Sequence, residues 1–278
     1  MPKADKDSKR FVMGAFDDIR TKDIRFLHEA KGDDTLFVRL LTDQAIERIT
    51  GKPPKFKLEE RRYYLKSIRY VTDVSSTDQT LPILPTEYYQ GGTVPLWIIS
   101  KKQAEGVVGD YLLNHEGDFI VMSESALDGF PMTETHDNPI SSKKKVMVSG
   151  CFDWVHTGHI RFFEEASQFG DLYVVVGHDQ NLRLLKGEGH PLFPQEERRY
   201  WVQSIHFVKQ AMISTGNGWL DAEPEVLAVK PDIFVVNHDG DRPEKRAFFK
   251  AHGIEYRVLA RKPKPGLPRR VSTELRGF

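Results

Sequence analysis

The sequence predicts an α/β protein built from two tandem units, each a doubly wound parallel sheet. Two observations carry this prediction. Short apolar runs alternate with segments whose apolar residues have helical spacing, which is typical of strand–helix–strand units. In addition, long stretches of the first half recur in the second half at an almost constant separation, which indicates a duplicated unit.

The repeat is clearest around a glycine, a phenylalanine and an aspartate. Aligning Gly14 with Gly150 gives nine identical residues in 17 positions. Three pairs of segments match, the first two at an offset of 136 and the third at 137: Gly14–Ala30 with Gly150–Ala166, Lys31–Gln44 with Ser167–Gln180, and Leu58–Val71 with Gln195–Val208. We therefore expect a disordered tail at 1–10, a first unit at 11–135 and a second at 144–278. The polar stretch Met132–Lys145 is the expected linker.

Strands and helices alternate in the second unit. The expected strands are Lys145–Gly150, Asp171–Asp179, Asp232–Asp241 and Ile254–Ala260; the expected helices are His159–Phe169, Pro194–Val208 and Arg242–Gly253, with a loop at Leu182–Pro194. The second helix would bury Tyr200, Val202, Ile205 and Phe207. Ligands of such sheets bind at the carboxyl ends of the strands, so residues after these strands are site candidates.

Composition limits the function. The 278 residues include 40 Lys+Arg and 40 Asp+Glu, and this balance predicts no general attraction to nucleic acid or membranes. One cysteine, Cys151, excludes an internal disulfide and a cysteine-based zinc cluster. No apolar run reaches the roughly 18 residues of a membrane span, and MPKADKDSKR has no signal-peptide core, so we expect a cytoplasmic protein.

His156 and His159 follow the first strand of the second unit, where a helix is expected to begin. A helix N-terminus has free N–H groups and a positive dipole end, which suit a phosphate, and Gly158 allows close approach of an anion. Two ordinary histidines or a metal-binding pair are the alternatives, although cysteine and HExxH partners for a metal are missing. The H-x-G-H pattern is weak alone and becomes specific after a strand and Gly-x-Phe-Asp.

GCFDWVHTGH, residues 150–159, resembles the GTFDxxHxGH motif of cytidylyltransferase-like nucleotidyltransferases. This family includes cytidylyltransferases for phosphoethanolamine, phosphocholine and glycerol 3-phosphate, and bacterial adenylyltransferases for sugar phosphates. Leu182–Ile205 resembles the family's loop lysine and E-x-R helix, and Pro268–Leu275 its closing R-T-x-G-I-S-T-T motif. The resemblance covers nearly all of the second unit and implies tandem Rossmann-like nucleotidyltransferase units.

The resemblance implies transfer of a nucleotidyl group, with CMP favoured over AMP, from an NTP to a phosphorylated small alcohol or sugar, with release of pyrophosphate (EC 2.7.7 type). Mg²⁺ would bridge the phosphates, without ligands assigned among the protein side chains. Phosphoethanolamine, glycerol 3-phosphate and sugar phosphates are candidate acceptors. By the same resemblance His156, His159 and Lys186 are catalytic; Gly150, Cys151, Phe152, Gly158, Asp239, Asp241, Arg270, Ser272 and Thr273 bind the nucleotide; and Asp153 and Arg198 bind the acceptor.

Simpler roles stand beside several of these assignments. Lys186 would otherwise be an exposed loop lysine, and Arg198 or the competing Arg199 would make helix ion pairs. Asp239 and Asp241 also suit a turn, and Ser272 or Thr273 a helix cap. The cluster Arg261, Lys262, Lys264, Arg269 and Arg270 indicates an anion site, for a triphosphate rather than RNA.

The chain departs from the family pattern at its ends. Cys151 replaces the usual threonine, Arg269 and Val271 flank a motif without its Thr-Glu-Gly part, and five residues follow Thr273. These departures leave the acceptor open.

The first unit lacks the histidine pair. Arg20, Lys22 and Asp23 lie over His156, Gly158 and His159, and Thr50 lies over Lys186. A carboxylate there would repel phosphate, so we expect an inactive unit that packs as an internal pseudo-dimer partner or binds a regulator. Phosphoethanolamine cytidylyltransferase has a similar two-unit arrangement, and other family members form homodimers. YLLNHEGD at 111–118 resembles FVVNHDGD in the second unit at an offset of only 123. Either the first unit has lost residues or the similarity is accidental.

Two other functions compete with this interpretation. A non-catalytic nucleotide sensor would bind an NTP without turnover. A relative of the aminoacyl-tRNA synthetases would share a related histidine motif, but the neutral chain shows no KMSKS-like loop.

Overall fold

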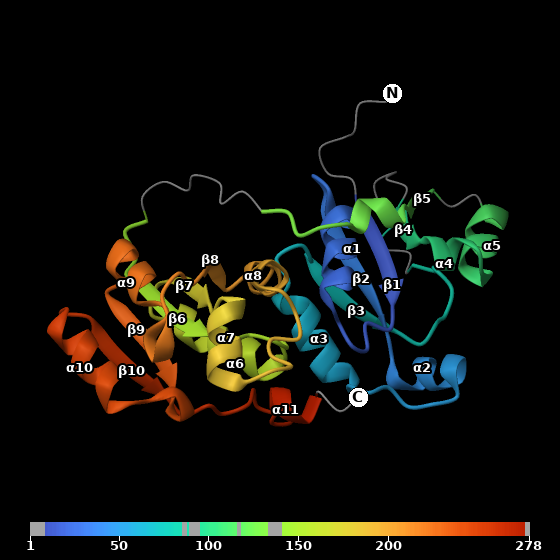
Figure 1. Ribbon diagram of the computed structural model, residues 1–278. Helices are drawn as coiled ribbons and strands as arrows, with labels where there is room; N and C mark the ends of the chain where they lie inside the picture. The colour runs from blue at the N-terminus through green and yellow to red at the C-terminus, as the bar shows by residue number, and fades with distance from the viewer. Residues whose placement is uncertain (1–8, 85–87, 89–94, 116–117, 133–140, 276–278) are drawn as a thin grey trace. The chain divides into compact units, whose positions relative to one another are not determined.

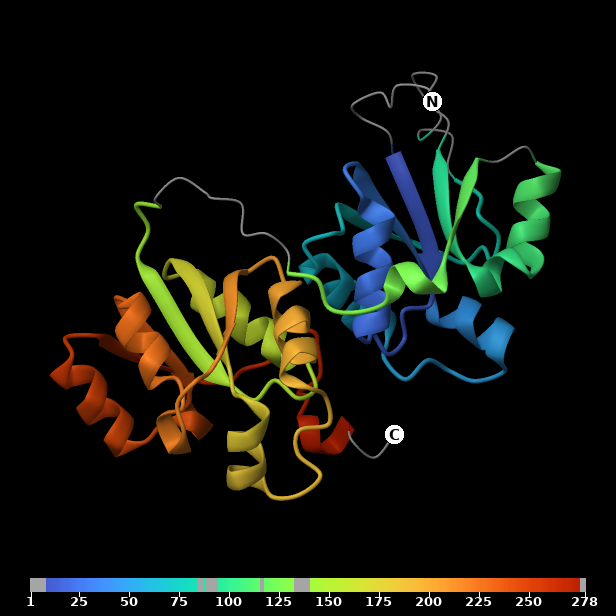
Figure 2. The same ribbon diagram turned by 45° about the horizontal axis from the view of Figure 1, so that its top comes forward.

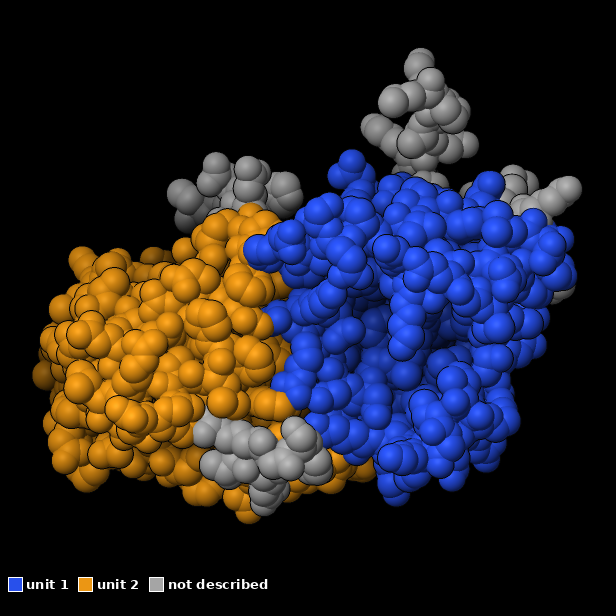
Figure 3. All heavy atoms as spheres, turned by 45° about the vertical axis from the view of Figure 1, so that its right-hand side comes forward, with its two compact units in different colours: residues 1–129 blue, residues 130–278 orange. Residues whose placement is uncertain are grey.

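The computed structural model describes residues 9–84, 88, 95–115, 118–132 and 141–275 (Figure 1). The chain divides into two compact units, residues 1–129 and 130–278, which Figure 3 shows in different colours. We refer to them as unit 1 and unit 2. The expected tail and most of the expected linker, residues 1–8 and 133–140, lie outside the described residues.

Unit 1 alternates strands and helices. Its elements are β1 Lys9–Gly14, α1 Thr21–Lys31, β2 Thr35–Leu41, α2 Asp43–Thr50, α3 Leu58–Ser67, β3 Asp73–Thr77, β4 Leu96–Ser100, α4 Lys101–Ala104, α5 Val107–Asn114, β5 Phe119–Met122 and the 3₁₀ turn η2 Glu124–Leu127.

Unit 2 repeats this order, and a 3₁₀ turn and a helix are described between its third and fourth strands. Its elements are β6 Lys145–Gly150, α6 Thr157–Ser167, β7 Asp171–Val176, α7 Asp179–Lys186, α8 Gln195–Gln203, β8 Val208–Ile213, η3 Gly218–Leu220, α9 Glu223–Val229, β9 Ile233–Asn237, η4 His238–Gly240, α10 Pro243–Ala251, β10 Glu255–Leu259 and α11 Ser272–Leu275.

Each unit contains a five-stranded parallel sheet flanked by helices, as predicted (Figures 1 and 2). The strand orders are β3-β2-β1-β4-β5 and β8-β7-β6-β9-β10, so the first strand of each unit is central. The registers repeat as well. Trp97 pairs with Phe119 in unit 1, and Phe234 pairs with Tyr256 in unit 2, each 137 positions later. The duplication therefore extends over the whole sheet.

Apolar side chains of the central strands form the cores. In unit 1 Phe11 and Trp97 pack with Leu112 of α5, and in unit 2 Met147 and Phe234 pack with Phe249 of α10. Burial of both faces explains why these strands appear as continuous apolar runs in the sequence.

Several element boundaries differ from the sequence prediction. Strand β1 begins at Lys9, inside the expected tail, because Lys9 pairs with Thr35 of β2. Helix α8 ends at Gln203, where Ser204 Oγ donates to the Trp201 carbonyl at 2.6 Å and Val208 then begins β8. Phe207 therefore lies outside the helix. Strand β8 and helix α9 were not predicted.

The expected loop at Leu182–Pro194 is helical in its first part, and Lys186 is the last residue of α7. His178 caps this helix by accepting from the Asn181 N–H at 3.2 Å, and the buried Asn181 exchanges hydrogen bonds with Gly218. Gly187, at φ 84°, ends the helix. The sequence prediction took this segment for a loop because glycines follow Lys186, and it could not show the hydrogen bonds of His178 and Asn181.

The similarity between YLLNHEGD in unit 1 and FVVNHDGD in unit 2 is accidental. Tyr111–Asn114 belongs to helix α5, whereas Val235–Asn237 belongs to strand β9. The counterpart of β9 is β4, which starts 137 positions before it and pairs with the same side of its central strand.

Candidate active site

A cavity of about 460 Å³ opens at the carboxyl ends of β6 and β9. The chain runs from β6 toward β7 on one side and returns to β9 on the other, so this is the switch point where doubly wound sheets bind ligands. The predicted site residues that line it are Gly150, Cys151, Phe152, Asp153, His156, Gly158, His159, Lys186, Asp239 and Ser272.

A tight turn connects β6 to the helix that carries the histidines. Phe152 has a φ of 50°, and its ring folds back over Gly150, where an added Cβ would lie 2.8 Å from the ring. Unit 1 has the same turn, with Phe16 at φ 46° over Gly14. The neighbouring phenylalanine therefore leaves no room for a side chain at Gly150 and little room at Gly14, where an added Cβ would lie 3.1 Å from the ring.

Asp153 fixes the segment between α7 and α8. Its Oδ1 accepts from the backbone N–H of Leu192 at 2.6 Å and of Phe193 at 3.1 Å, and the residue is 4% exposed. In unit 1 Asp17 accepts from the matching N–H groups of Lys55 and Phe56 at 2.7 and 2.8 Å. This carboxylate has a structural role in both units, besides lining the cavity of unit 2.

Arg198 does not line the cavity, contrary to its prediction as an acceptor-binding residue. It is 0% exposed, and its guanidinium donates to the carbonyls of Phe193, Cys151 and Gly177 at 2.6 to 2.9 Å and to Asp179 at 2.7 Å. These bonds occupy the group and fix the ends of β6 and β7. The alternative, Arg199, is also buried, with a contact to Met132.

His156 is the N-cap residue of α6. Its Nδ1 accepts from the Gly158 N–H at 3.0 Å, and the residue is 4% exposed. An added Cβ at Gly158 would lie 2.8 Å from the His156 ring and 3.4 Å from the Arg270 carbonyl. The glycine thus makes room for the capping ring as well as for a ligand.

The two imidazoles contact each other at the cavity wall, with their planes inclined by 31°. Their ring centroids are 4.1 Å apart, and Phe152 contacts His159 edge-on at 5.5 Å. Three buried polar atoms around the cavity have no hydrogen-bond partner among the described residues: His156 Nε2, His159 Nδ1 and Asn237 Oδ1. Buried polar atoms need partners, so this cluster fits a polar ligand.

Burial, with Arg261 and Arg270 nearby, lowers the pKa of His156 to about 4. Burial, His156 and Arg261 lower the pKa of His159 well below its usual value. Both rings are therefore neutral at pH 7 in the free protein. A neutral imidazole still offers one N–H donor to a phosphate.

Lys186 reaches the cavity from the end of α7. Burial raises the pKa of the Cys151 thiol, whereas the nearby Lys186 ammonium lowers it. The lysine therefore lies beside the turn after β6, at the end of a helix rather than in the expected loop.

Of the two aspartates that were predicted to bind the nucleotide, only Asp239 lies at the cavity. Asp239 lines the cavity and pairs with Arg261, which has a φ of 50°. Asp241 lies outside the cavity lining and accepts from Arg246 at 2.9 and 2.5 Å, a contact that lowers the pKa of Asp241. A nucleotide-binding role for Asp241 therefore has no support from its position.

The lining residues that sequence reasoning missed include His190, Asn237, Lys245 and Arg261, of which Arg261 had been assigned only to a basic cluster. Lys245 sits in the first turn of α10, and burial, with help from Arg242, lowers its pKa. Its counterpart in unit 1 is Val108, so the comparison of the repeats could have revealed it.

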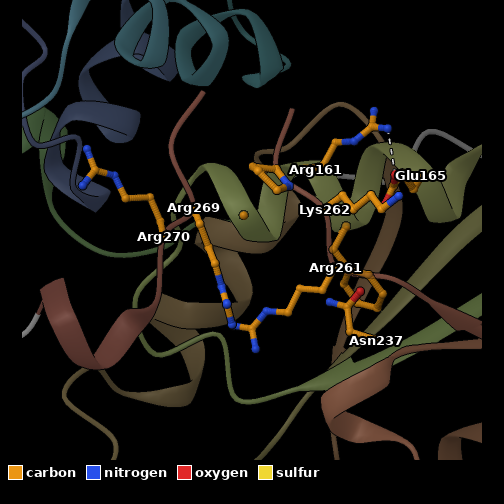
Figure 4. A pocket seen from close by; sticks show the side chains of 10 residues that line it. Arg161, Glu165, Asn237, Arg261, Lys262, Arg269 and Arg270 are labelled. Carbon is orange, nitrogen blue, oxygen red and sulfur yellow. Dashed lines mark hydrogen bonds and ion pairs between the residues drawn. The ribbon is translucent and has the colours of Figure 1, made fainter. Parts of the chain in front are cut away.

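A narrow basic groove adjoins the cavity and shares Gly158, Phe162, Asn237 and Arg261 with it. Its other basic residues are Arg161, Lys262, Arg269 and Arg270. In Figure 4 the Arg261 and Arg269 side chains point toward each other, whereas Arg270 points away. Arg161 pairs with Glu165 at 2.7 Å. The placement of the Thr273 side chain lies outside the description.

The corresponding positions of unit 1 are filled by their own ion pairs. Asp23 accepts from the Arg20 backbone N–H at 2.8 Å and so caps α1. Lys22 pairs with Glu124 at 2.6 Å, where unit 2 has Gly158 and Arg261. These contacts occupy the Lys22 ammonium and one oxygen of Asp23 at the positions where unit 2 has Gly158 and His159.

Comparison with known proteins agrees with this geometry. The Cytidylyltransferase-like family model matches residues 147–255. An FAD synthase of Thermococcus kodakarensis is 36% identical over 124 residues, which are 42% of this chain and 78% of that protein. The chain belongs to the cytidylyltransferase-like family. It is accordingly a nucleotidyltransferase.

Further proteins are similar to parts of this chain. An FAD synthase of Ferroglobus placidus is 33% identical, covering 42% of this chain and 74% of that protein. The bifunctional protein HldE of Alcanivorax borkumensis is 31% identical over 50% of this chain, which spans only 28% of HldE. A lipopolysaccharide core biosynthesis protein of Thermoplasma volcanium aligns at 27% identity over 42% of this chain and 96% of its own, with a TM-score of 0.37, too low to define a shared fold.

Across the described ranges, no helix is long and apolar enough to cross a membrane. Within the same ranges, no three His, Cys, Asp or Glu side chains are grouped to hold a metal ion.

Proposed function

We propose that unit 2 transfers a nucleotidyl group from an NTP to the phosphate of a small phosphorylated acceptor and releases pyrophosphate. One observation carries the proposal: His156 and His159 line a 460 Å³ cavity at the N-terminus of α6, and each has a buried ring nitrogen without a partner among the described residues. Such nitrogens and helix N–H groups suit a triphosphate.

The reaction needs no nucleophile from the protein. An oxygen of the acceptor phosphate forms the new bond to the α-phosphorus, and the bond from that phosphorus to the bridging oxygen breaks as pyrophosphate leaves. The protein supplies position and positive charge. His156 and His159 would donate to the triphosphate, and Lys186, Lys245 and Arg261 would offset its charge.

The remaining predicted contacts are part of this proposal. The N–H groups of Gly150, Cys151 and Phe152 would border the nucleotide, and Ser272 and Thr273 would approach its terminal phosphates. A divalent ion such as Mg²⁺ would neutralise phosphate charge when bound. Mg²⁺ commonly enters such sites on substrate phosphates with several waters. The cavity lining includes three cationic side chains and three imidazoles beside two carboxylates, so the phosphates would supply most of the ligands of the ion.

We infer that ATP is the nucleotide, in preference to the CTP favoured by the sequence. This chain covers 78% and 74% of two relatives that are named FAD synthases, and FAD contains an AMP unit. The acceptor would be a phosphorylated alcohol, a sugar phosphate or FMN. Unit 1, with its ion-paired helix start, would not catalyse transfer and would serve as an internal partner of unit 2.

The test is pyrophosphate release by the full chain with ATP and CTP, in the presence of Mg²⁺, across FMN, glycerol 3-phosphate, phosphoethanolamine and sugar phosphates. We expect release with ATP and one acceptor, reduced on the order of a hundredfold or more by His156→Ala or His159→Ala. His115→Ala, in unit 1, is the matched control. Binding of an NTP without turnover would contradict the proposal in favour of a sensor, and absence of binding would contradict the site itself.

A further inference from the structure

His190 is the third histidine of the cavity, and no role has been given to it so far. It lies on the segment between α7 and α8, and its Nδ1 is 3.7 Å from Asp153 Oδ2. The other oxygen of that carboxylate is held by the Leu192 and Phe193 N–H groups. A fixed, buried carboxylate thus stands behind an imidazole that faces the cavity.

The comparison between the units separates the histidine from the structural role of the aspartate. Asp17 of unit 1 keeps both backbone bonds of Asp153, yet Pro53 occupies the position of His190. The segment therefore folds against its carboxylate without any histidine. His190 occurs only in the unit that also has the histidine pair and Lys186.

The position of His190 assigns it to one side of the cavity. The segment between α7 and α8 follows β7, whereas Asn237 and Lys245 follow β9, on the opposite side of β6. The histidine pair lies between them, at the start of α6. A reaction that joins two phosphates needs a positive or donating group for each of them.

We propose that His190, held by Asp153, binds the phosphate of the acceptor and directs its oxygen to the α-phosphorus. This inference rests on the nucleotidyl transfer proposed above. With Asp153 beside its Nδ1, the imidazole would donate a hydrogen bond from a ring N–H to the phosphate. His190 gives up no proton in this step, because the attacking oxygen is already anionic.

The first experiment measures KM for each substrate in full-length variants. His190→Gln should raise the acceptor KM about tenfold or more and change the NTP KM less than about twofold. His190→Arg should restore the acceptor KM to within about threefold, because a guanidinium also pairs with phosphate. His252→Gln, an exposed histidine at the end of α10, is the control.

Two kinetic outcomes would overturn the inference. One is an unchanged acceptor KM in His190→Gln. The other is an equal rise of both KM values that His190→Arg does not repair, since this would indicate a structural role only.

A second experiment separates this inference from the proposed function. The imidazole C2 proton of His190, assigned with His190→Gln, is followed by NMR while methyl phosphate is added to the full chain with a non-hydrolysable ATP analogue. A saturable shift supports the inference even if no acceptor is turned over. A shift confined to other histidines, or no shift, overturns it even if transfer is confirmed.

Discussion

The two units share one half of a motif and differ in the other half. Gly14 and Gly150 begin the same turn, and Arg61 donates to Phe56, Ala15, Leu41 and Asp43 as Arg198 does to Phe193, Cys151, Gly177 and Asp179. The helix start that follows differs completely. The first half of the motif therefore supports the fold in both units, and the histidines and Gly158 distinguish unit 2 from unit 1 in the second half.

The strongest test of this comparison moves one residue between the units. Gly158→Lys introduces the unit 1 residue, whose Cβ would lie 2.8 Å from the His156 ring and whose ammonium would enter the phosphate position. We expect nucleotidyl transfer to fall by more than about a hundredfold, measured as pyrophosphate release. The reverse change in unit 1, Lys22→Gly, should leave the rate unaltered; normal activity in Gly158→Lys would show that the helix start is not the site.

The arginine network that both units share is tested by measuring the stability of each unit. Arg61→Gln and Arg198→Gln each remove a buried guanidinium with four hydrogen bonds, and each should destabilise its own unit by about 3–5 kcal/mol. Hydrogen exchange of β1 and β2 against β6 and β7 reports the two units separately. The exposed Arg48→Gln is the control. If only one of the two substitutions destabilised its own unit, the two arginine networks would not be equivalent.

Burial of the histidine pair predicts that the stability of unit 2 depends on pH, with a smaller effect than loss of a buried arginine. Because the folded pKa of His156, about 4, lies below its unfolded value of 6.5, the unfolded chain binds more protons between these pH values. Unit 2 should therefore lose stability as the pH falls from about 6.5 to 4, with His156 contributing about 3 kcal/mol in total.

Urea unfolding at a series of pH values measures this loss, and His156→Gln should remove most of that contribution. The comparison is made with this variant rather than with unit 1, since burial also lowers the pKa of His28 there. An unchanged pH dependence in His156→Gln would show that folding does not lower the pKa of His156.

The sequence predicted the fold well because the repeat and the apolar strands are local patterns. It placed β6, β7, β9 and β10 and the helix that carries His156 and His159. It missed β8, whose alternation of buried and partly buried residues is less marked. It also took α7 for a loop, since the anchoring of Asn181 by Gly218 joins positions far apart in the chain.

The site was predictable where one segment carries it and less so where several segments meet. The histidine pair and the turn before it lie in one motif. Lys245, Arg261 and His190 come from three later segments, and only the fold brings them to the cavity. Arg198 shows the opposite error: an arginine beside a motif suggested a ligand contact, but its four partners belong to the protein.

The cap at the start of α6 also fixes a tautomer. Because His156 Nδ1 accepts the Gly158 N–H, the single proton of the neutral ring must reside on Nε2, the buried atom without a partner among the described residues. The ring thus presents a donor to the cavity without being charged, and the same backbone bond that starts the helix orients that donor. In unit 1 the N-cap residue of α1 is Arg20, which has no imidazole. The helix start there therefore has no neutral ring donor oriented by a backbone hydrogen bond.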